Sequence, residues 1–403
     1  MHPIRDNADM TTPAPTRYFI GLMSGTSLDG VDGVLCQIND HGDVQVVQHV
    51  HEAFHPRTRE VAYTLNQAGH NELHLAAQLG TQLAHDYSAV CRRLFQAHDL
   101  SASAVCAIGA HGQTVRHQPE AASTLAGDAS VGYSVQVNHP ALLAEHTGID
   151  VIADFRARDL AAGGQGAPLV PAFHRGVFGR AGVDVAVLNI GGIANASVLA
   201  GNGGLAGCDT GPGNVLLDLW AQQHLGTPFD TDGAWGGSGR VAPALLAHFL
   251  SDPFFQHNQA RQPSSTGRDD FNATWLHKTL TAFPAVEALE AVDVQATLGA
   301  LTAQSAATQV RHLLQHLHTI STEPAQLLVC GGGAYNQQLM QLLQQALPQT
   351  HVTTTDTVGL PVLQVEAAAF AWLAWCFVTH RSGNAIQATG AKGPRILGAL
   401  YPK

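Results

Sequence analysis

The sequence predicts an α/β protein made of two related parts that face each other across a cleft. Three observations predict it. The chain has 403 residues, enough for two domains. Apolar runs typical of strands meet at glycine-rich turns early in each half, and alternating helical and strand-like segments follow in both. We expect a flexible tail over 1–16, domains over 17–150 and 151–380, and a C-terminal segment over 381–403 that packs back on the first domain.

The first half begins with a hairpin. Apolar runs at Tyr18–Met23 and Val31–Ile38 flank a polar turn rich in glycine, and a third strand is expected around Val44–Val50. The elements expected next are a helix over Leu73–Phe95, strands over Val105–Gly109 and Val131–Val137, a helix over Pro140–Thr147 and a strand over Ile149–Ala153.

The second half repeats this plan. A strand over Asp184–Ile190 leads into a glycine turn, and a strand over Ala194–Leu199 returns from it. Residues 230–270 show little regular pattern, so loops or insertions are expected there, and the glycine-rich stretch 160–171 is expected where the halves cross. The elements expected elsewhere are helices over Asn214–His224 and Val294–Leu317, a strand over Gln326–Val329, and helices over Asn336–Leu347 and Glu366–Thr379.

Composition excludes several classes of protein. The formal net charge is −11 and no dense basic run occurs, which argues against a nucleic-acid partner. No apolar run approaches the roughly 20 residues that a membrane span needs, and the polar N-terminal residues do not resemble a signal peptide. The chain lacks GxxxxGK[ST] and has only three lysines, so bound phosphates would be neutralised by backbone N–H groups, arginine and a metal ion.

Cysteines and histidines do not form recognisable metal or disulfide patterns. Six cysteines are scattered without CxxC spacing, several in apolar runs, which predicts reduced, buried thiols. The pairs His312/His316 and His49/His51 have helical and strand spacing, but no neighbouring carboxylate or cysteine completes a zinc set. We therefore expect solvated or core histidines.

Three glycine-rich turns are candidates for binding a nucleotide. Glycine lets the backbone approach a phosphate, N–H and hydroxyl groups donate to it, and an aspartate can hold a hydrated Mg²⁺. Each turn, taken alone, is also explained as an ordinary turn without a ligand. The candidate residues are Gly25, Thr26, Ser27, Leu28, Asp29, Gly30, Val31 and Asp32 in the first turn, Gly191 and Gly192 in the second, and Gly331, Gly332 and Gly333 in the third.

Asp209 is the candidate general base. It follows a short apolar stretch and precedes a glycine-proline turn and a helix, which places its carboxylate at a strand end facing the cleft. Phosphoryl transfer needs positioning, charge neutralisation and a base aimed at the nucleophile. The alternative is that Asp209 only caps the helix.

Arg116 and Arg156 are candidate anion clamps, because a guanidinium binds carboxylate or phosphate with a bidentate fork. The alternative is a buried structural ion pair, for Arg156 with Asp154 or Asp159.

Gln113, Gln165 and Glu366 are further candidates for binding a substrate. The two glutamines can bind hydroxyl or acetamido groups, or only water. Glu366 starts an apolar helix, where it either reaches the substrate or simply interacts with the helix N-terminus.

Seven motifs in order resemble the anhydro-N-acetylmuramic acid kinase family, from about Phe19 to Tyr401. The resemblance implies two actin/hexokinase-like (ribonuclease H-like) domains flanking a nucleotide- and substrate-binding cleft. It also implies ATP and Mg²⁺ as cofactors, a cytoplasmic location and a homodimer. The matching segments are GLMSGTSLDG (21–30), HGQTVRH (111–117), DFR (154–156), GGQGAPLVP (163–171), NIGGIAN (189–195), DTGPGN (209–214) and GGGAYN (331–336).

The family's substrate implies a coupled reaction. In a 1,6-anhydro sugar the 6-oxygen is bound to the anomeric carbon, so no free hydroxyl is available for phosphorylation. Asp209 matches the family's catalytic aspartate, which would deprotonate a water that attacks the anomeric carbon while the 6-oxygen takes the γ-phosphoryl group. The products would be ADP and N-acetylmuramic acid 6-phosphate. The lactyl carboxylate would then be bound by Arg156 or Arg116.

Two alternatives and one departure remain open. The chain fits a conventional sugar or carboxylate kinase in which Asp209 deprotonates a free hydroxyl, or a non-enzymatic ATP-driven clamp; dependence of ATP turnover on a sugar distinguishes them. Before Pro140 the family has glycine followed by asparagine or aspartate, whereas this chain has Asn138-His139. The sugar contacts of this loop are therefore left open.

Overall fold

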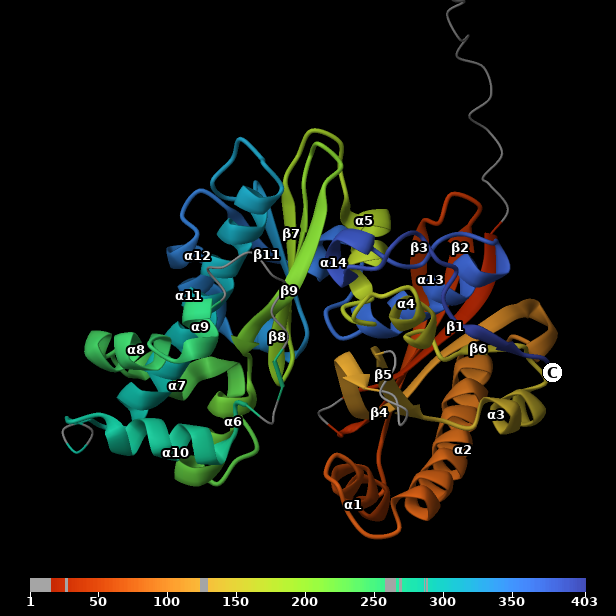
Figure 1. Ribbon diagram of the computed structural model, residues 1–403, viewed down its shortest axis with the longest axis horizontal. Coiled ribbons are helices and arrows are strands. Elements are labelled where there is room, and N and C mark those ends of the chain that lie inside the picture. Colours follow the sequence, from red (N-terminus) through yellow and green to blue (C-terminus); the bar gives the residue numbers. More distant parts are fainter. Residues whose placement is uncertain are drawn as a thin grey trace, which may run out of the picture.

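The computed structural model of the chain describes two α/β halves side by side (Figure 1). The residues described are 16–25, 28–123, 130–257, 266–267, 270–285, 287 and 289–403. The tail expected over 1–16, apart from Thr16, and the turn residues Thr26 and Ser27 lie outside this part of the chain.

The first sheet has the strand order β12-β6-β4-β1-β2-β3, with β5 paired to β4. Strands β1, β2 and β3 pair antiparallel to one another in sequence order, whereas β4 and β6 run parallel to β1. The bounds are β1 (Thr16–Ser24), β2 (Gly30–Asn39), β3 (Val44–Ala53), β4 (Val105–Ser123), β5 (Ser130–Val137), β6 (Val151–Ala153) and β12 (Ala399–Tyr401).

The second sheet has the order β11-β10-β7-β8-β9 and repeats the same plan. Strands β7, β8 and β9 are antiparallel, and β10 and β11 run parallel to β7. The bounds are β7 (Val185–Ile190), β8 (Ile193–Leu199), β9 (Leu205–Pro212), β10 (Gln326–Cys330) and β11 (His351–Thr354). The two sheets share one topology of three antiparallel strands followed by two parallel ones, so the predicted actin/hexokinase-like fold is confirmed.

Glycines allow the apolar helix α13 (Val365–Val378) to pack directly on the first sheet. A Cβ added to Gly21 of β1 would lie 1.8 Å from the carbonyl oxygen of Ala367, and one on Gly109 of β4 would lie 2.0 Å from that of Phe370. Only glycine therefore permits this approach. A single apolar core runs from this face of the first sheet through α13 to the second sheet.

The opposite face of the first sheet is covered by the long helix α2 (Glu72–His98), whose Val90 packs over Gly33. In the second half, α11 (Ala291–His316) is the longest helix and is buried along much of its length. The other α-helices in the described part of the chain are α1 (Pro56–Leu65), α3 (Pro140–Thr147), α4 (Ala157–Ala161), α5 (Val170–Phe178), α6 (Val215–Leu225), α7 (Ala234–Ser238), α8 (Pro243–Leu250), α9 (Pro253–His257), α10 (Ala273–Ala282), α12 (Gln337–Ala346) and α14 (Ile386–Thr389).

The expectation of loops over 230–270 is wrong for much of that stretch, because α7, α8 and α9 lie within it. These helices are too short to show a clear period, and α8 and α9 begin at prolines. They bury Leu245, Phe249 and Phe255 in a separate core with α6, α10 and α11.

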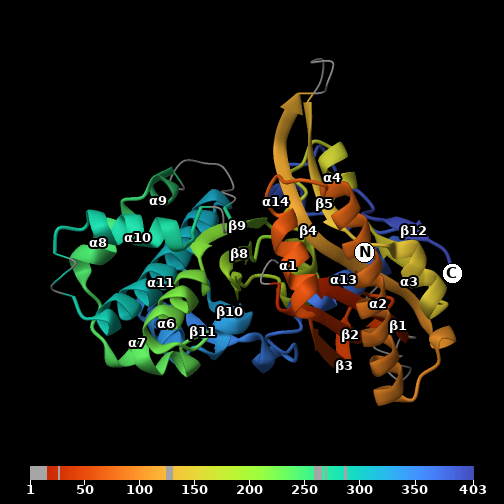
Figure 2. The same cartoon turned by 90° about the horizontal axis from the view of Figure 1, so that it is seen from below.

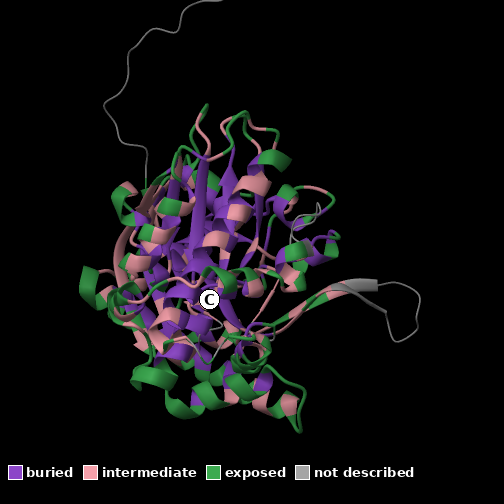
Figure 3. Ribbon diagram, turned by 90° about the vertical axis from the view of Figure 1, so that its left-hand side faces the viewer, coloured by how far each residue is buried: buried purple, intermediate pink, exposed green. Residues whose placement is uncertain are grey.

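One hairpin projects from the compact halves and is less buried than they are. Strands β4 and β5 continue beyond the sheet as a hairpin arm (Figure 2), which carries little of the buried core (Figure 3). All six cysteines are free thiols, five of them buried, as predicted. Among the helices that the structure describes, none is long and apolar enough to cross a membrane.

Candidate active site

The second and third predicted turns lie against each other at the carboxyl ends of β7 and β10. Gly331 has φ +79°, and a Cβ on it would lie 2.4 Å from Asn189 Oδ1. A Cβ on Gly333 would lie 2.3 Å from the side chain of Ile190. The Asn214 N–H donates to the Gly191 carbonyl at 2.8 Å, which adds the start of α6 to the same surface. Bare backbone therefore forms one close-packed surface, at the sheet edge where α/β proteins bind ligands.

The first predicted turn lies at the equivalent end of β1. Gly25 accepts hydrogen bonds from Leu28 N–H (3.3 Å) and from Gln113 Nε2 (3.2 Å). Leu28 has φ +57° and a buried side chain, whereas Asp29 is exposed at the tip. A Cβ on Gly30 would lie 2.2 Å from the Glu52 carbonyl, so glycine is required there. Gln113 thus supports the turn rather than standing apart from it.

Three members of the first turn, Gly30, Val31 and Asp32, lie within strand β2. The Val31 side chain is fully buried in the core under α2. Asp32 accepts hydrogen bonds from two histidines of β3: its Oδ1 lies 2.9 Å from His49 Nε2 and 3.1 Å from His51 Nδ1. The structure therefore supplies the carboxylate partner that sequence spacing alone did not show for this histidine pair. No group of three or more potential metal ligands occurs in the part of the chain that is described.

Asp209 lies in β9, opposite Asn195 of β8. The helix that follows is α6, whose N-cap residue is Asn214, so the interpretation of Asp209 as a helix cap is wrong. Its Oδ2 accepts the N–H of Thr266 at 2.9 Å. The carboxylate also lies close enough to Arg156 to raise that residue's pKa, so the base candidate and a clamp candidate share one electrostatic environment.

Arg156 is held beside His111 of β4. Its Nε and one terminal nitrogen lie 3.1 Å and 3.0 Å from His111 Nε2, and its other terminal nitrogen donates to the Gly166 carbonyl at 2.7 Å. Burial lowers the pKa of Arg156 to about 10, while Glu366, Asp159 and Asp209 oppose the shift. The guanidinium is therefore cationic at neutral pH.

The ion-pair interpretation of Arg156 is not supported by its contacts. No described carboxylate lies within ion-pair distance of it. Asp159 is fully buried and accepts from Gly166 N–H at 2.9 Å and from Thr389 Oγ1 at 2.9 Å. The Arg156 guanidinium therefore contacts a neutral imidazole. Burial, and to a smaller extent Arg156 itself, lower the pKa of His111 well below its usual value.

Arg116 has a different environment. One of its terminal nitrogens forms a 2.9 Å ion pair with Glu72 of α2, and the other donates to the carbonyls of Leu65 and, at 2.8 Å, Val115. Arg116 therefore takes part in an ion pair, whereas Arg156 has none with a described carboxylate. Gln165 is half-buried near the C-terminal segment, with its N–H donating to Thr389.

Glu366 lies in the first turn of α13 and is half-buried. Burial raises its pKa, Arg156 opposes that, and Asp32 and Asp29 raise it further. Asp29 and Asp32 of the first turn are thus close enough to Glu366 to affect its ionisation. Mg²⁺ needs only one or two protein carboxylates when phosphate and water complete its shell.

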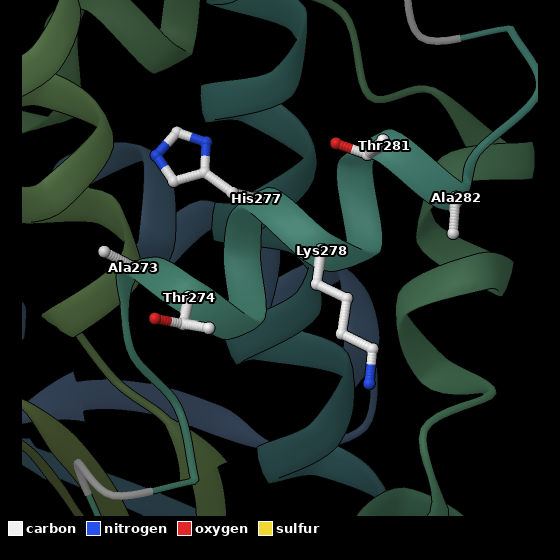
Figure 4. A pocket seen from close by; sticks show the side chains of 6 residues that line it. All are labelled: Ala273, Thr274, His277, Lys278, Thr281 and Ala282. Atoms are coloured by element: carbon white, nitrogen blue, oxygen red, sulfur yellow. The ribbon is translucent and has the colours of Figure 1, made fainter.

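Two cavities differ in their relation to these residues. The larger, about 650 Å³, lies along α10 and is lined by residues such as His277 and Lys278 (Figure 4), away from every residue named above. The smaller, about 260 Å³, includes His111 and Asp154 in its lining. Sequence reasoning gave no role to His111, although it ends the apolar run of a predicted strand, which was the signal available.

Comparison with known sequences gives one family. A sequence model described as anhydro-N-acetylmuramic acid kinase matches residues 17–403. The protein of that name from Variovorax paradoxus (strain S110) is 51% identical over 389 residues, covering 95% of this chain and 98% of that protein. The one from Bordetella avium (strain 197N) is 50% identical over 390 residues, covering 96% and 97%.

Among solved structures, the similarity is looser. A ROK family glucokinase from Streptomyces griseus, in complex with glucose and AMPPNP, aligns with a TM-score of 0.38 and 12% identity. The alignment covers 88% of this chain and 98% of that one. A similarity of this size carries no argument, so the fold assignment rests on the strand order itself.

Proposed function

The chain belongs to the anhydro-N-acetylmuramic acid kinase family, and we propose that Asp209 and Arg156 form its reacting centre. The enzyme uses ATP to open 1,6-anhydro-N-acetylmuramic acid by hydrolysis and to phosphorylate its 6-oxygen, giving N-acetylmuramic acid 6-phosphate and ADP in peptidoglycan recycling. The observation that carries the proposed centre is that Asp209 and Glu366 both lie close enough to Arg156 to raise its pKa, while His111 and the Gly166 carbonyl hold the guanidinium in place.

In this mechanism Asp209 acts as general base. Its carboxylate takes a proton from water, and the water oxygen forms a bond to the anomeric carbon. The bond from that carbon to the bridging 6-oxygen breaks, and the electron pair released on the 6-oxygen attacks the γ-phosphorus, from which ADP departs. The hydrogen bond from Thr266 N–H supports the mechanism, because it fixes one oxygen of the base in place.

Arg156 is proposed to bind the lactyl carboxylate. His111 and the Gly166 carbonyl fix the guanidinium in one orientation, which favours bidentate recognition of a planar anion. The absence of an ion pair to any described carboxylate leaves its charge for a ligand. Arg116, already paired with Glu72, is excluded from this role in the proposal.

The nucleotide is proposed to lie across the glycine turns of both halves. Gly191, Gly192 and the Gly331–Gly333 turn offer backbone that phosphate or ribose can approach. Asp29 and Glu366 would hold Mg²⁺ there, which would neutralise charge on the transferred phosphoryl group. Gln113 supports the first turn through Gly25.

We also propose a cytoplasmic, homodimeric enzyme with the domain division expected from the sequence. Free thiols at all six cysteines fit a reducing compartment. The homodimer rests on the family resemblance, and light scattering at several concentrations tests it.

Labelled water tests the coupled reaction. In H₂¹⁸O with ATP and Mg²⁺, mass spectrometry should find one ¹⁸O in the product, on the anomeric carbon, and none in the phosphate. Chelating Mg²⁺ should stop both ring opening and ADP release. Product incubated alone in H₂¹⁸O measures background exchange. Label in the phosphate, or ring opening that continues without ATP consumption, contradicts the proposal.

A further inference from the structure

Asp159 is a fully buried carboxylate that takes no part in the proposed reaction. It lies in the short helix α4, whose N-cap residue is Arg156. Fully buried charged groups are uncommon in proteins and are kept where donors or cations compensate for the loss of water. No ion pair to Asp159 occurs among the described residues, so hydrogen-bond donors offset this cost.

Three donors converge on the two oxygens of this carboxylate. Its Oδ2 accepts the N–H of Gly166 at 2.9 Å. Its Oδ1 accepts from Asn384 Nδ2 and from Thr389 Oγ1, each at 2.9 Å. A Cβ on Gly164 would lie 2.3 Å from Oδ2, so this glycine leaves room for the carboxylate. Asp159 therefore joins the glycine-rich loop to the C-terminal segment.

Gly166 connects Asp159 to Arg156. Its N–H donates to Asp159, and its carbonyl accepts from the Arg156 guanidinium at 2.7 Å. Gly166 has φ +68° and no side chain, so its backbone is freer to move than that of other residues unless a contact holds it. The bond to Asp159 thus fixes the residue whose carbonyl orients the guanidinium.

The C-terminal segment completes this support and extends it to the second half. Helix α14 lies between the halves, against β9, the strand that carries Asp209 (Figure 1). The Thr389 carbonyl at the end of α14 accepts the N–H of Gln165 at 2.8 Å, and the Lys392 N–H donates to the Ala162 carbonyl at 2.9 Å. One segment therefore contacts both the loop beside Arg156 and the strand of the proposed base.

We propose that Asp159 is a positioning residue for Arg156 and thereby a determinant of specificity for sugars that carry a carboxylate. Through Gly166 it holds the guanidinium in the orientation that a planar anion requires. Through Asn384 and Thr389 it ties that arrangement to the C-terminal segment. Asp159 itself does not touch the substrate. The inference rests on the proposed role of Arg156 in binding the lactyl carboxylate.

An amide of the same size cannot replace this carboxylate. The orientation of Asn384 is fixed, because its Oδ1 accepts the N–H of Arg395 at 2.8 Å, so its Nδ2 faces Asp159. In Asp159→Asn, the orientation that keeps both bonds to the C-terminal segment turns the new amide nitrogen toward the Gly166 N–H, where donor meets donor. The bond that supports Arg156 is therefore the one that is lost.

Two sugars and a double variant test the proposal. Asp159→Asn, Arg156→Ala and the double variant are assayed for kcat and KM on 1,6-anhydro-N-acetylmuramic acid and on 1,6-anhydro-N-acetylglucosamine, which lacks the lactyl group. Asp159→Asn should lose about tenfold in kcat/KM on the muramic sugar, mainly through KM, and little on the other. In the Arg156→Ala background the same change should add no more than about twofold, because no guanidinium is left to position.

Asp184→Asn is the matched control. This carboxylate also accepts a backbone N–H, from Gly201 at 2.8 Å, but it lies at the amino end of β7, away from the glycine turns. The variant should leave the ratio of kcat/KM between the two sugars unchanged.

The ratio between the sugars decides the outcome. Equal losses of Asp159→Asn on both sugars, or a full additional loss in the double variant, would show a purely structural role and overturn the proposal. If Asp159→Asn does not fold, Thr389→Val removes a single bond to Oδ1 and should give a smaller loss with the same selectivity; an unselective loss overturns the proposal equally. Failure of the proposed function is distinguishable, because Arg156→Ala would then itself affect both sugars equally.

Discussion

The two halves share a strand order but contribute different things to the site. In the second half, turns at the ends of β7 and β10 pack so closely that glycine alone fits at Gly331 and Gly333. In the first half, the equivalent edge collects charge: Asp29 and Asp32 lie near Glu366, and Arg156 lies against His111. One fold thus supplies a rigid backbone surface from one copy and charged side chains from the other.

Asp209 is the exception to this division, because it is a charged residue on the second sheet. If it is the base, Asp209→Asn should lower ring opening and ADP release together by about 10²–10⁴-fold, since the amide cannot accept the proton. ATP binding should be retained, because the nucleotide is proposed to lie on other turns. Following both products by mass spectrometry in one reaction, with calorimetry for ATP, measures this.

Near-normal rates in Asp209→Asn would show that Asp209 is not the general base and that another carboxylate takes this role. Asn195→Ala changes the residue of β8 that is paired with Asp209 of β9. This variant is the matched control and should have a much smaller effect. A variant that opened the ring without consuming ATP would show that the two steps are separable.

The two candidate anion clamps provide the next test. Arg156→Ala should lower kcat/KM for the muramic substrate about 10–100-fold more than for 1,6-anhydro-N-acetylglucosamine, which lacks the lactyl carboxylate, because a charged hydrogen bond is lost. Arg116→Ala should instead reduce thermal stability, through loss of its Glu72 pair and Leu65 contact, and affect both sugars equally. The opposite pattern would exchange the roles assigned here.

The sequence alone predicted the secondary-structure elements better than the contacts that individual side chains make in the fold. The apolar runs of β1, β7 and β10 and the long helices were identified because their signals are local. The choice between Arg116 and Arg156 was not available, since both follow apolar runs in the sequence and only the tertiary fold brings Glu72 to one and His111 to the other. The cavity beside His111 was equally hidden, because its walls combine β4, β5 and β6 with Tyr401 of β12, near the other end of the sequence.

The rigidity of the second half can be tested at adjacent glycines. Gly331→Ala should reduce stability by about 2 kcal/mol and weaken ATP binding, because its φ of +79° and the Asn189 side chain leave no room for a Cβ. Gly332→Ala is the matched control, since a Cβ there would meet only Asn214, at 3.6 Å. Urea unfolding and calorimetry measure both effects. Equal behaviour of the two variants would contradict a rigid surface centred on Gly331.

The smallest expected effect concerns acid sensitivity, which the structure assigns to both halves. His111 and His117 are neutral in the first half, and His174 is neutral in the second, where its Nδ1 lies 3.0 Å from Ser197 Oγ. Burial lowers the pKa of His174 to about 3, whereas an unfolded histidine titrates near 6.5. Between these values the unfolded chain binds more protons, so stability falls as pH drops below about 6.5 and is unaffected above it.

His174→Gln isolates the share of the second half, because glutamine can still bond to Ser197 and does not titrate. At pH 5.5 the wild-type His174 should cost about 1.4 kcal/mol relative to pH 7.5, so the variant should lose that much less stability over this interval. Urea unfolding at the two pH values measures the difference, while the remaining loss in the variant reports the other histidines, among them His111 and His117. If wild type and variant lost the same stability, His174 would be protonated in the folded state, and the acid sensitivity would belong to other groups.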